Sequence, residues 1–228
     1  MRIAFLSDLH LESRCIHKTI SRLYIPKVDL ILLPGDIGML NNNIEIYKYN
    51  KFLNHINTNK IGNIPVVLIP GNHEYYGYSF SNMENPFNIL KSLCEQNNII
   101  LLQNQKISLT KNCNLLGTTL WTEKYHKFEN QGLLYKESFK FLRENNNSQN
   151  DIIVTHFLPY IPKYLFLDKF KSYKNFIGSD ILTYLSYKAI FHGHNHYTYT
   201  LPNKVYSNPI GHPHENFKDN INFKMVEI

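Results

Sequence analysis

Short apolar runs alternate with longer amphipathic segments along this chain. Five of the runs have strand length and carry mostly branched residues: Ile3–Leu6, Leu30–Leu33, Val66–Ile69, Ile152–Val154 and Ala189–Phe191. Between them, apolar positions return every three or four residues, which predicts helices over Asn43–Ile56, Met83–Gln96 and Leu133–Arg143. Because the strand runs lack in–out alternation and are separated by helices, they predict a sheet that is covered on both faces.

Two further segments have a different pattern. The stretch Ile99–Trp121 is typical of two or three short strands in succession, and the tail Val205–Ile228 is also rich in strand residues. Together with the strands that alternate with helices, these segments predict a mixed α/β sandwich. No internal repeat or Pro/Gly/Ser-rich linker interrupts the pattern, so residues 1–228 are expected to form a single domain.

The overall charge is moderately basic. The formal net charge is +6 and the pI is near 9.0, which favours anionic partners such as phosphate-bearing substrates, nucleic acid or acidic surfaces. No dense run of Lys and Arg is present, as a nucleic-acid-binding tail would require. A mildly basic surface without any specific partner is equally compatible with this charge, and no feature indicates an obligate protein partner.

The cysteines and the first residues indicate a compartment. Cys15, Cys94 and Cys113 are odd in number and widely spaced, which favours free thiols in a reducing compartment. Asp8 and His10 interrupt the first apolar run, which is therefore too short for a signal peptide or a membrane span. We therefore expect a soluble, cytoplasmic protein without membrane insertion.

Each of the five apolar runs ends in polar residues that are able to bind a metal. The sequences at these ends are FLSDLH, LLPGDIG, VLIPGNHE, IVTHF and IFHGHNH. In α/β sheets, loops at the carboxyl ends of the strands converge on one crevice. Taken alone, each motif is common in proteins without a metal, but the five together predict a metal site. The candidate ligands are Asp8, His10, Asp36, Asn72, His156, His194 and His196.

The spacing and the residue types agree with this hypothesis. Asp8 and His10 are two residues apart, as are His194 and His196, and on extended backbone such residues point the same way. Carboxylate, amide and imidazole ligands suit Mn, Fe, Co or Zn, whereas the absence of thiolates argues against a structural zinc site. Three glycines beside the candidate ligands would permit sharp exits from the strands: Gly35, Gly71 and Gly193.

The order of these motifs resembles the calcineurin-like metallophosphoesterase superfamily. The motifs are D-x-H, G-D, G-N-H-E, a lone His after a strand, and G-H-x-H, and they extend from Asp8 to His196. The resemblance implies an α/β fold in which a two-sheet mixed β-sandwich is flanked by helices. It also implies a dinuclear metal centre at the strand ends.

The resemblance assigns the residues to two divalent ions, for which Mn is the first choice and Fe, Zn and Co are alternatives. One ion would be held by Asp8, His10 and His196. The other would be held by Asn72, His156 and His194, and Asp36 would bridge the two. His73 matches the catalytic histidine of the family, which lies close to the metals.

The resemblance further implies hydrolysis of an anionic phosphate ester. A hydroxide held between the ions would attack phosphorus, Asn72 would steady a phosphate oxygen, and His73 would protonate the leaving alkoxide or stabilise its charge. A small phosphodiester is preferred as substrate, such as a nucleotide or a short nucleic acid. The alternatives are a phosphomonoesterase or protein phosphatase, and a non-catalytic scaffold of the same fold, against which the complete ligand set argues.

Two segments are candidates for substrate selection. Four aromatic residues follow the third motif and would either stack on a nucleobase or pack the loop against the protein: Tyr75, Tyr76, Tyr78 and Phe80. The segment Tyr160–Phe176 interleaves lysines with aromatics, which fits either a basic lid or an amphipathic helix with a solvated lysine face.

Other residues near the motifs depart from the family pattern or have an expected place in the structure. Phe157 stands where many relatives have a second His, and Ile210 stands where many carry an Arg. His192 is expected to be a strand residue rather than a ligand. Two histidines after the last motif are expected on the surface: His212 and His214. Two residues are candidates for orienting the histidine ligands: Glu74 and Thr155.

Overall fold

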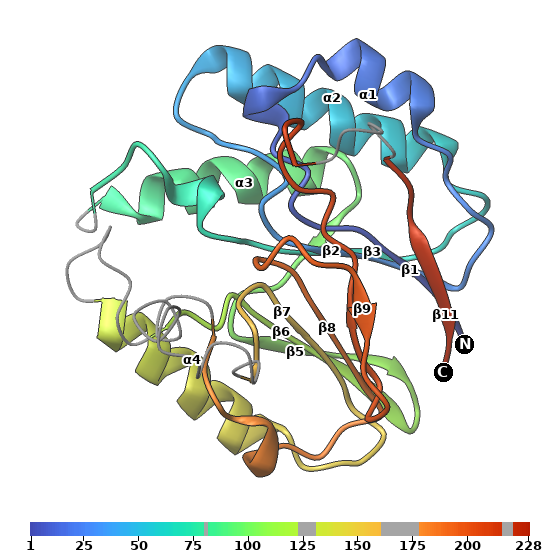
Figure 1. The fold of residues 1–228 in the computed structure, drawn as a ribbon, viewed down its shortest axis with the longest axis vertical. Helices are drawn as coiled ribbons and strands as arrows, with labels where there is room; N and C mark the ends of the chain where they lie inside the picture. The colour runs from blue at the N-terminus through green and yellow to red at the C-terminus, as the bar shows by residue number, and fades with distance from the viewer. Residues whose placement is uncertain (80–81, 123–130, 161–177, 216–220) are drawn as a thin grey trace.

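Two β-sheets pack face to face in the computed structural model of the chain, and helices cover both outer faces (Figure 1). The structure describes residues 1–79, 82–122, 131–160, 178–215 and 221–228. The layers are therefore helix, sheet, sheet and helix. This arrangement confirms the predicted α/β fold, a two-sheet mixed sandwich flanked by helices.

The first sheet has five strands in the order β11-β1-β2-β3-β4. Their bounds are β1 (Arg2–Phe5), β2 (Leu30–Pro34), β3 (Val66–Ile69), β4 (Ile100–Leu101) and β11 (Lys224–Glu227). The strands β1 to β4 are parallel to their neighbours, whereas β11 pairs antiparallel with β1 at the edge. The pairing of β11 with β1 brings the two termini together, and the amino group of Met1 donates a hydrogen bond of 3.0 Å to the carbonyl of Ile228 (Figure 1).

The second sheet has six strands in the order β5-β6-β7-β8-β10-β9. Their bounds are β5 (Gln105–Thr110), β6 (Cys113–Thr118), β7 (Ile152–Thr155), β8 (Ala189–His192), β9 (Tyr199–Thr200) and β10 (Val205–Ser207). The four strands β6, β7, β8 and β10 run parallel, and the edge strands β5 and β9 are antiparallel to their neighbours.

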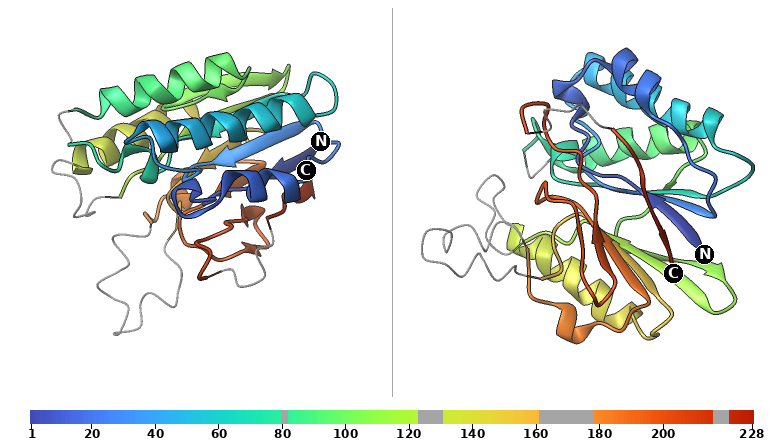
Figure 2. Two further views of the ribbon diagram at one scale, coloured as in Figure 1. Left: turned by 90° about the horizontal axis from the view of Figure 1, so that it is seen from above. Right: turned by 45° about the vertical axis from the view of Figure 1, so that its right-hand side comes forward.

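Among the described residues, three α-helices cover the outer face of the first sheet and one covers that of the second (Figures 1 and 2). They are α1 (Ile16–Arg22), α2 (Asn43–Asn59) and α3 (Glu84–Gln96) over the first sheet, and α4 (Gln131–Asn145) over the second. Asn42 begins α2, because its side-chain oxygen accepts hydrogen bonds from the backbone N–H groups of Ile44 and Glu45. No described helix is both long and apolar enough to cross a membrane.

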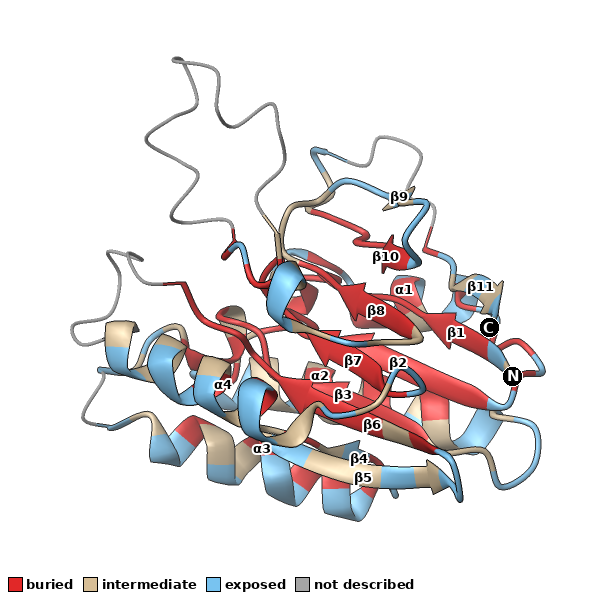
Figure 3. Ribbon diagram, turned by 90° about the horizontal axis from the view of Figure 1, so that it is seen from below, coloured by how far each residue is buried: buried red, intermediate tan, exposed pale blue. Residues whose placement is uncertain are grey.

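The period-two alternation of the strands divides their side chains between two cores. In β2, Leu30 and Leu32 point between the sheets, while Ile31 and Leu33 pack against the helices. Because both faces are covered, central strands such as β2, β3, β7 and β8 are buried throughout, whereas the edge strands and the helices also carry exposed positions (Figure 3). This burial explains why the central strands are apolar up to their carboxyl ends.

The predicted strands and helices lie within a few residues of the observed ones. The prediction did not include α1, which has only seven residues and therefore offers little periodicity. The expectation of free cysteines is confirmed, because Cys15, Cys94 and Cys113 form no disulfide.

Candidate metal centre

The candidate ligands all lie in loops that follow strands of the two sheets. Asp8 and His10 follow β1, Asp36 follows β2, and Asn72 follows β3 in the first sheet. His156 follows β7, while His194 and His196 follow β8 in the second sheet. The structure brings all seven residues into two neighbouring groups, with contributions from both sheets.

One group, called here the His156 group, consists of Asp36, Asn72, His156 and His194. The Nε2 atom of His156 lies 2.9 Å from Asn72 Oδ1, 3.2 Å from His194 Nδ1 and 3.3 Å from Asp36 Oδ2. His156 is fully buried, and Asp36 and Asn72 are 2% and 1% exposed. The other ring nitrogen of His156, Nδ1, lies 2.9 Å from the backbone carbonyl of Pro34, so this carbonyl sets the orientation of the ring.

The other group, called here the His10 group, consists of Asp8, His10 and His196. The Nε2 atoms of His10 and His196 lie 3.0 Å apart, and Asp8 Oδ1 lies 3.5 Å from His196 Nε2. Asp8 also accepts hydrogen bonds of 2.9 and 3.0 Å from the backbone N–H of His194. Asp8 and His10 are fully buried, whereas the side chain of His196 is 21% exposed.

Both groups fit a divalent transition-metal ion. Ligands at bond lengths of about 2.0–2.2 Å stand about 2.8–3.6 Å from one another around an ion. The donor separations of 2.9–3.3 Å in the His156 group and of 3.0–3.5 Å in the His10 group fall in this range. The mixture of imidazole, carboxylate and amide oxygen donors suits Mn, Fe, Co or Zn.

Five of the candidate ligands have left-handed backbone conformations. Their φ angles are 51° at Asp8, 50° at His10, 53° at Asp36, 72° at His194 and 53° at His196. Such φ values cost non-glycine residues about 1–3 kcal/mol each and concentrate at functional sites. The extended-backbone explanation for the paired spacing is therefore wrong. The pairs lie on left-handed loops, and His194 and His196 point into different groups.

Two glycines are required by space rather than by backbone conformation. A Cβ atom on Gly71 would lie 2.2 Å from Asp36 Oδ1, and one on Gly193 would lie 2.4 Å from Asp8 Oδ2. Only a residue without a side chain lets the backbone approach the carboxylates this closely. Of the three glycines beside the candidate ligands, Gly35 alone has a left-handed backbone, with φ of 79°.

The charges in each group balance one another. Burial alone would raise the pKa of Asp8, but a hydrogen bond from His196 and the charge of His156 lower it. Burial would likewise raise the pKa of Asp36, and His156 and His73 hold it well below the ordinary value. Burial opposes the charged form of both histidines, yet Asp36 raises the pKa of His156 to about 9 and Asp8 raises the pKa of His196 to about 9. Ions that bind here would therefore displace protons.

His73 lies beside both groups without belonging to either. Its Nε2 atom is 3.9 Å from Asp36 Oδ2, and its backbone N–H donates a hydrogen bond of 2.8 Å to Asp36 Oδ1. Its Nδ1 atom lies 2.8 Å from Glu12 Oε1, which is also 3.0 Å from His10 Nδ1. Burial lowers the pKa of His73, but Asp36 and Glu12 outweigh this effect and raise it.

The residues that orient the histidines differ from those expected. Glu74 is fully buried, but it accepts hydrogen bonds from the backbone N–H groups of Asp36, Ile37 and Gly71 and from the hydroxyl of Tyr49. Burial and the charge of Asp36 raise the pKa of Glu74 to about 7. Glu74 therefore braces the loops that carry the ligands and contacts no histidine ring through these bonds.

The expectation for Thr155 is also wrong. Its hydroxyl donates to the carbonyl of Phe157. The carboxylates that contact histidine rings are instead those of Glu12, beside His10 and His73, and of Glu215, whose Oε2 atom lies 2.6 Å from His196 Nδ1. The only sequence signal for these two residues is an acidic side chain two residues after His10 and another three residues after His212.

The prediction that His212 is a surface residue is wrong, whereas His214 is exposed as expected. The His212 ring is half-buried and stacks on His10, with ring centroids 3.9 Å apart and an interplanar angle of 22°. The loop is held by the backbone, since Ile210 N–H and Gly211 N–H donate to the carbonyls of Ser7 and Asp8. Partial burial and the nearby rings of His10 and His196 lower the pKa of His212 to about 4.

His212 and His10 also lie close to His73, as a third cluster of nitrogen donors. A histidine binds a metal in the plane of its ring, and nearly parallel stacked rings direct their lone pairs along separate planes. The stacking of His212 on His10 therefore argues against one ion shared by these two rings. His212 forms a wall of the site beside the His10 group.

Two of the aromatic residues after the third motif pack the loop as one alternative predicted, and a third lies at the site. Tyr75 is buried against Trp121, and the hydroxyl of Tyr78 donates to the carbonyl of Leu40, so both pack the loop against the protein. Tyr76 lies at the site, because its ring is 4.3 Å from that of His73 and its hydroxyl accepts a hydrogen bond of 2.7 Å from Asn72 Nδ2.

Other sequence expectations concern the wall and the loops around the site. Phe157 is buried, with its ring 4.0 Å from that of His194, so it packs against a candidate ligand. His192 is a buried residue of β8, as expected. Phe80 and residues 161–177 lie outside the described residues.

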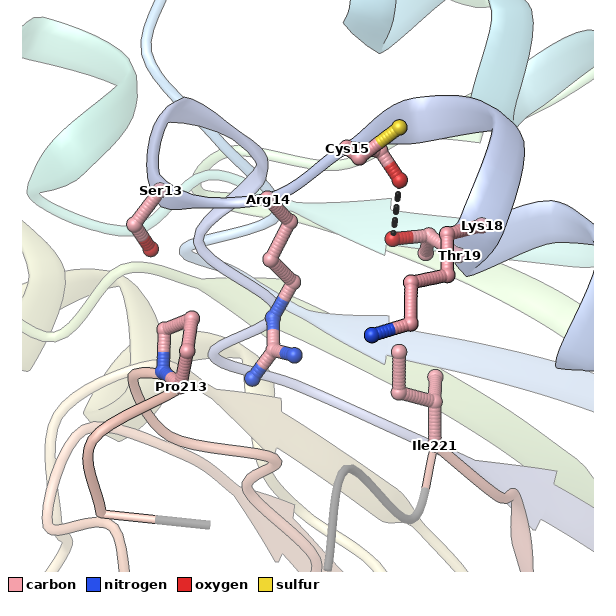
Figure 4. A pocket seen from close by; sticks show the side chains of 7 residues that line it. All are labelled: Ser13, Arg14, Cys15, Lys18, Thr19, Pro213 and Ile221. Carbon is pink, nitrogen blue, oxygen red and sulfur yellow. Dashed lines mark hydrogen bonds between the residues drawn. The ribbon is translucent and has the colours of Figure 1, made fainter. Parts of the chain in front are cut away.

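A separate cavity of about 160 Å³ lies beside α1, behind the loop that carries His212 (Figure 4). Its lining includes Arg14, Lys18 and Pro213, and none of the candidate ligands. Arg14 Nε and Nη2 donate to the carbonyls of Leu9 and Gly211 at 2.7 and 2.6 Å. Arg14 thus ties the loop of His212 to the loop that follows β1.

Comparisons with known proteins identify a family and a shared fold. A family model described as calcineurin-like phosphoesterase matches residues 1–198. One crystal structure covers 99% of this chain and 98% of its own, with a TM-score of 0.56 and 12% identity, which shows a shared fold. A dimetal phosphatase from Danio rerio covers 92% of this chain and 86% of its own, with a TM-score of 0.44 and 12% identity. No curated protein matches the sequence.

Proposed function

This chain belongs to the calcineurin-like phosphoesterase family, and from that premise we propose that it is a phosphodiesterase acting on a nucleotide or another small phosphodiester. Members of the family depend on a dinuclear metal centre, so the protein is a metal-dependent hydrolase of phosphate esters. The proposal concerns the substrate, the ligand assignment and the part that each side chain takes.

One observation supports the proposal most directly. The His10 group and the His156 group lie together, and they are assembled from the loops after β1, β2, β3, β7 and β8. Because both sheets contribute, neither sheet alone would form the site. We therefore also propose that residues 1–228 act as a single domain.

The proposed ligands follow the two groups. The His10 group would hold one divalent ion, the His156 group the other, and Asp36 would bridge them. Mn is our first choice of metal, with Fe, Zn and Co as alternatives. When bound, two ions supply charge stabilisation for the phosphate oxygens and a nucleophile derived from water at neutral pH.

The side chains beside the ligands would position the substrate and move a proton. His73 presents Nε2 toward the site and would donate a proton to the leaving oxygen, a role that its raised pKa favours. Asn72 keeps Oδ1 near His156, its amide nitrogen donates to Tyr76, and this side chain would steady a phosphate oxygen. These roles need no covalent intermediate on the protein.

The preference for a diester is supported by the residues that border the ligands. His73, Tyr76 and His212 are two imidazoles and a phenol, and the low pKa of His212 keeps its ring neutral at pH 7. A wall with a neutral imidazole suits a diester with one negative charge better than a monoester with two. The net charge of +6 favours anionic substrates in general.

The test compares two synthetic esters. Metal-stripped protein is incubated with Mn²⁺ and either bis(p-nitrophenyl) phosphate or p-nitrophenyl phosphate, and release of p-nitrophenol is followed. We expect metal-dependent release from the diester and little release from the monoester. The control is Asp36→Ala, which removes the proposed bridge and should abolish release.

Each other outcome changes the proposal. Release from the monoester alone would replace the diesterase with a phosphomonoesterase. Release that persists in Asp36→Ala would overturn the ligand assignment. No release from either ester, with two bound metals per chain, would favour a narrow substrate or a scaffold and would contradict the proposed small-diester activity.

A further inference from the structure

A single carboxylate oxygen connects the His10 group with His73. Glu12 Oε1 lies 3.0 Å from His10 Nδ1 and 2.8 Å from His73 Nδ1. The two rings meet edge to face, with their centroids 4.4 Å apart. The carboxylate contacts the same ring nitrogen, Nδ1, on both.

We propose that Glu12 is a positioning residue that sets the tautomers of His10 and His73 together. An ionised carboxylate only accepts hydrogen bonds, so both Nδ1 atoms must carry a hydrogen. The Nε2 lone pair of His10 is then free to bind an ion, and Nε2 of His73 is free to work at the substrate. The His73 part of this inference rests on the proposed function.

The same contact supports the proton transfer assigned to His73. A protonated His73 carries hydrogens on both ring nitrogens. As the water-derived oxygen bonds to phosphorus and the P–O bond to the leaving group breaks, the Nε2 proton would pass to the leaving oxygen. The neutral ring that remains keeps its hydrogen on Nδ1. This tautomer still donates a hydrogen bond to Glu12. Glu12 would therefore hold the ring in one orientation before and after the transfer.

Hydrogen bonds fix the backbone turn that carries Glu12. It lies in the short helical turn Leu11–Ser13, where the hydroxyl of Ser13 donates to the carbonyl of His10 and Lys48 Nζ donates to the carbonyl of Leu11. Its second oxygen, Oε2, is buried and has no hydrogen-bond partner among the described residues. A buried oxygen without a hydrogen bond destabilises the protein. We therefore attribute the presence of a glutamate at this position to the contacts of Oε1 with the two histidines.

Glu215 offers a matched control within the same group. It contacts His196 Nδ1 at 2.6 Å, just as Glu12 contacts His10 Nδ1, but no hydrogen bond or ion pair described in the structure joins it to His73. Glu12→Ala and Glu215→Ala therefore both remove a carboxylate from a histidine of the His10 group. Only Glu12→Ala also releases His73.

The first experiment measures the tautomers directly in the metal-free full-length protein. Long-range ¹H–¹⁵N spectra with labelled histidine distinguish the Nδ1–H from the Nε2–H form, and His10→Gln and His73→Gln assign the two signals. We expect the Nδ1–H form for both rings in the wild type and a shift toward Nε2–H for both in Glu12→Ala. Glu215→Ala should leave both signals unchanged.

The second experiment measures the dependence on the leaving group in Mn²⁺-loaded protein. Bis(p-nitrophenyl) phosphate has a good leaving group, and diphenyl phosphate has a poor one that needs a proton. We expect Glu12→Ala to lose about tenfold more activity on diphenyl phosphate than on the nitrophenyl ester. Glu215→Ala should lose the same factor on both, and Glu12→Gln, whose carbonyl still accepts, should recover part of the loss.

The outcomes separate this inference from the proposed function. Unchanged tautomers in Glu12→Ala, or equal losses on the two esters, would overturn the positioning role even if the wild type is an active diesterase. If the wild type hydrolyses neither ester, the proposed function fails. The NMR measurement then decides by itself whether Glu12 sets both tautomers.

Discussion

The two candidate metal groups lie side by side but are supported in different ways. In the His156 group, the ring of His156 is fully buried and its outer nitrogen contacts a neutral backbone carbonyl at Pro34. In the His10 group, the outer nitrogens of His10 and His196 contact carboxylates, which belong to Glu12 and Glu215. The side chain of His196 is 21% exposed, and that of Glu215 is 41% exposed.

The difference follows from the cost of burying charge. A carboxylate in the position of the Pro34 carbonyl would add a second buried negative charge beside Asp36, with a large desolvation penalty. Water reduces that penalty for the exposed Glu215, whereas the more buried Glu12 is compensated by hydrogen bonds with His10 and His73. His73 adjoins both groups, because it contacts Asp36 in the His156 group and Glu12 beside the His10 group.

The largest expected effect comes from removing one histidine of each group. We expect His156→Ala and His196→Ala each to lower diesterase activity more than 100-fold, because each removes a proposed ligand. In the metal-free protein, His156→Ala should also cost about 2 kcal/mol of unfolding free energy, since it leaves a buried cavity and an unpaired carbonyl. The partly exposed His196 should cost less than about 1 kcal/mol. Activity assays and urea denaturation measure both effects, and equal unfolding costs would contradict the comparison.

Smaller losses are expected from adding a methyl group beside each carboxylate. Gly71→Ala would press on Asp36 in the His156 group, and Gly193→Ala would press on Asp8 in the His10 group. A misplaced ligand should weaken binding of the corresponding ion about 10- to 100-fold, similar to the loss of an orienting contact. Metal titration by calorimetry should show one weakened site in each variant, and a loss at both sites in either variant would mean that the groups are not separable.

A pH titration tests the charge balance in each group. His156 and His196 have pKa values of about 9 in the metal-free protein, above the ordinary 6.5, because nearby aspartates outweigh burial. Each keeps its proton between pH 6.5 and 9, so metal affinity should rise about tenfold per pH unit for each displaced proton in that window and level off above pH 9.

The same titration distinguishes the groups when Glu215 is changed. Glu215→Gln removes one of the charges that raise the pKa of His196, so affinity at the His10 group should level off at a lower pH. The His156 group should titrate as before. Affinity that does not depend on pH at either group would show that neither histidine loses a proton when the ion binds.

The smallest effect is expected at the wall of the His10 group. His212→Ala removes a ring that stacks on His10 but is not a proposed ligand, so KM for bis(p-nitrophenyl) phosphate should rise about 2- to 5-fold with little change in kcat. The exposed His214 serves as the control, and His214→Ala should leave both constants unchanged. A large fall in kcat would instead place His212 at the reacting atoms.

The sequence predicted the strands and the ligand candidates because both signals are local. A run such as Leu30–Leu33 is apolar throughout because each face of its sheet is covered, and the polar residues begin where the strand leaves the core. Residue spacing did not predict the backbone conformation of the ligands. Asp8 and His10 do converge, but on left-handed loop backbone, which residue type alone does not reveal.

The residues that were missed connect parts of the chain that lie far apart. Glu215 reaches His196 from 19 positions away, and Glu12 reaches His73 from 61 positions away. His212 stacks on His10 because backbone hydrogen bonds tie Ile210 and Gly211 to the loop after β1. The residues adjacent to them in the sequence do not predict these contacts.

The sequence by itself therefore determined the alternation of strands and helices, the donor atoms at the strand ends and the family to which they point. These features depend on side-chain period and residue type, which are properties of short segments. The tertiary structure alone decided how the donors divide into two groups and which carboxylates orient their histidines. Those choices depend on the packing of two sheets against each other, which places loops from distant segments within hydrogen-bonding distance.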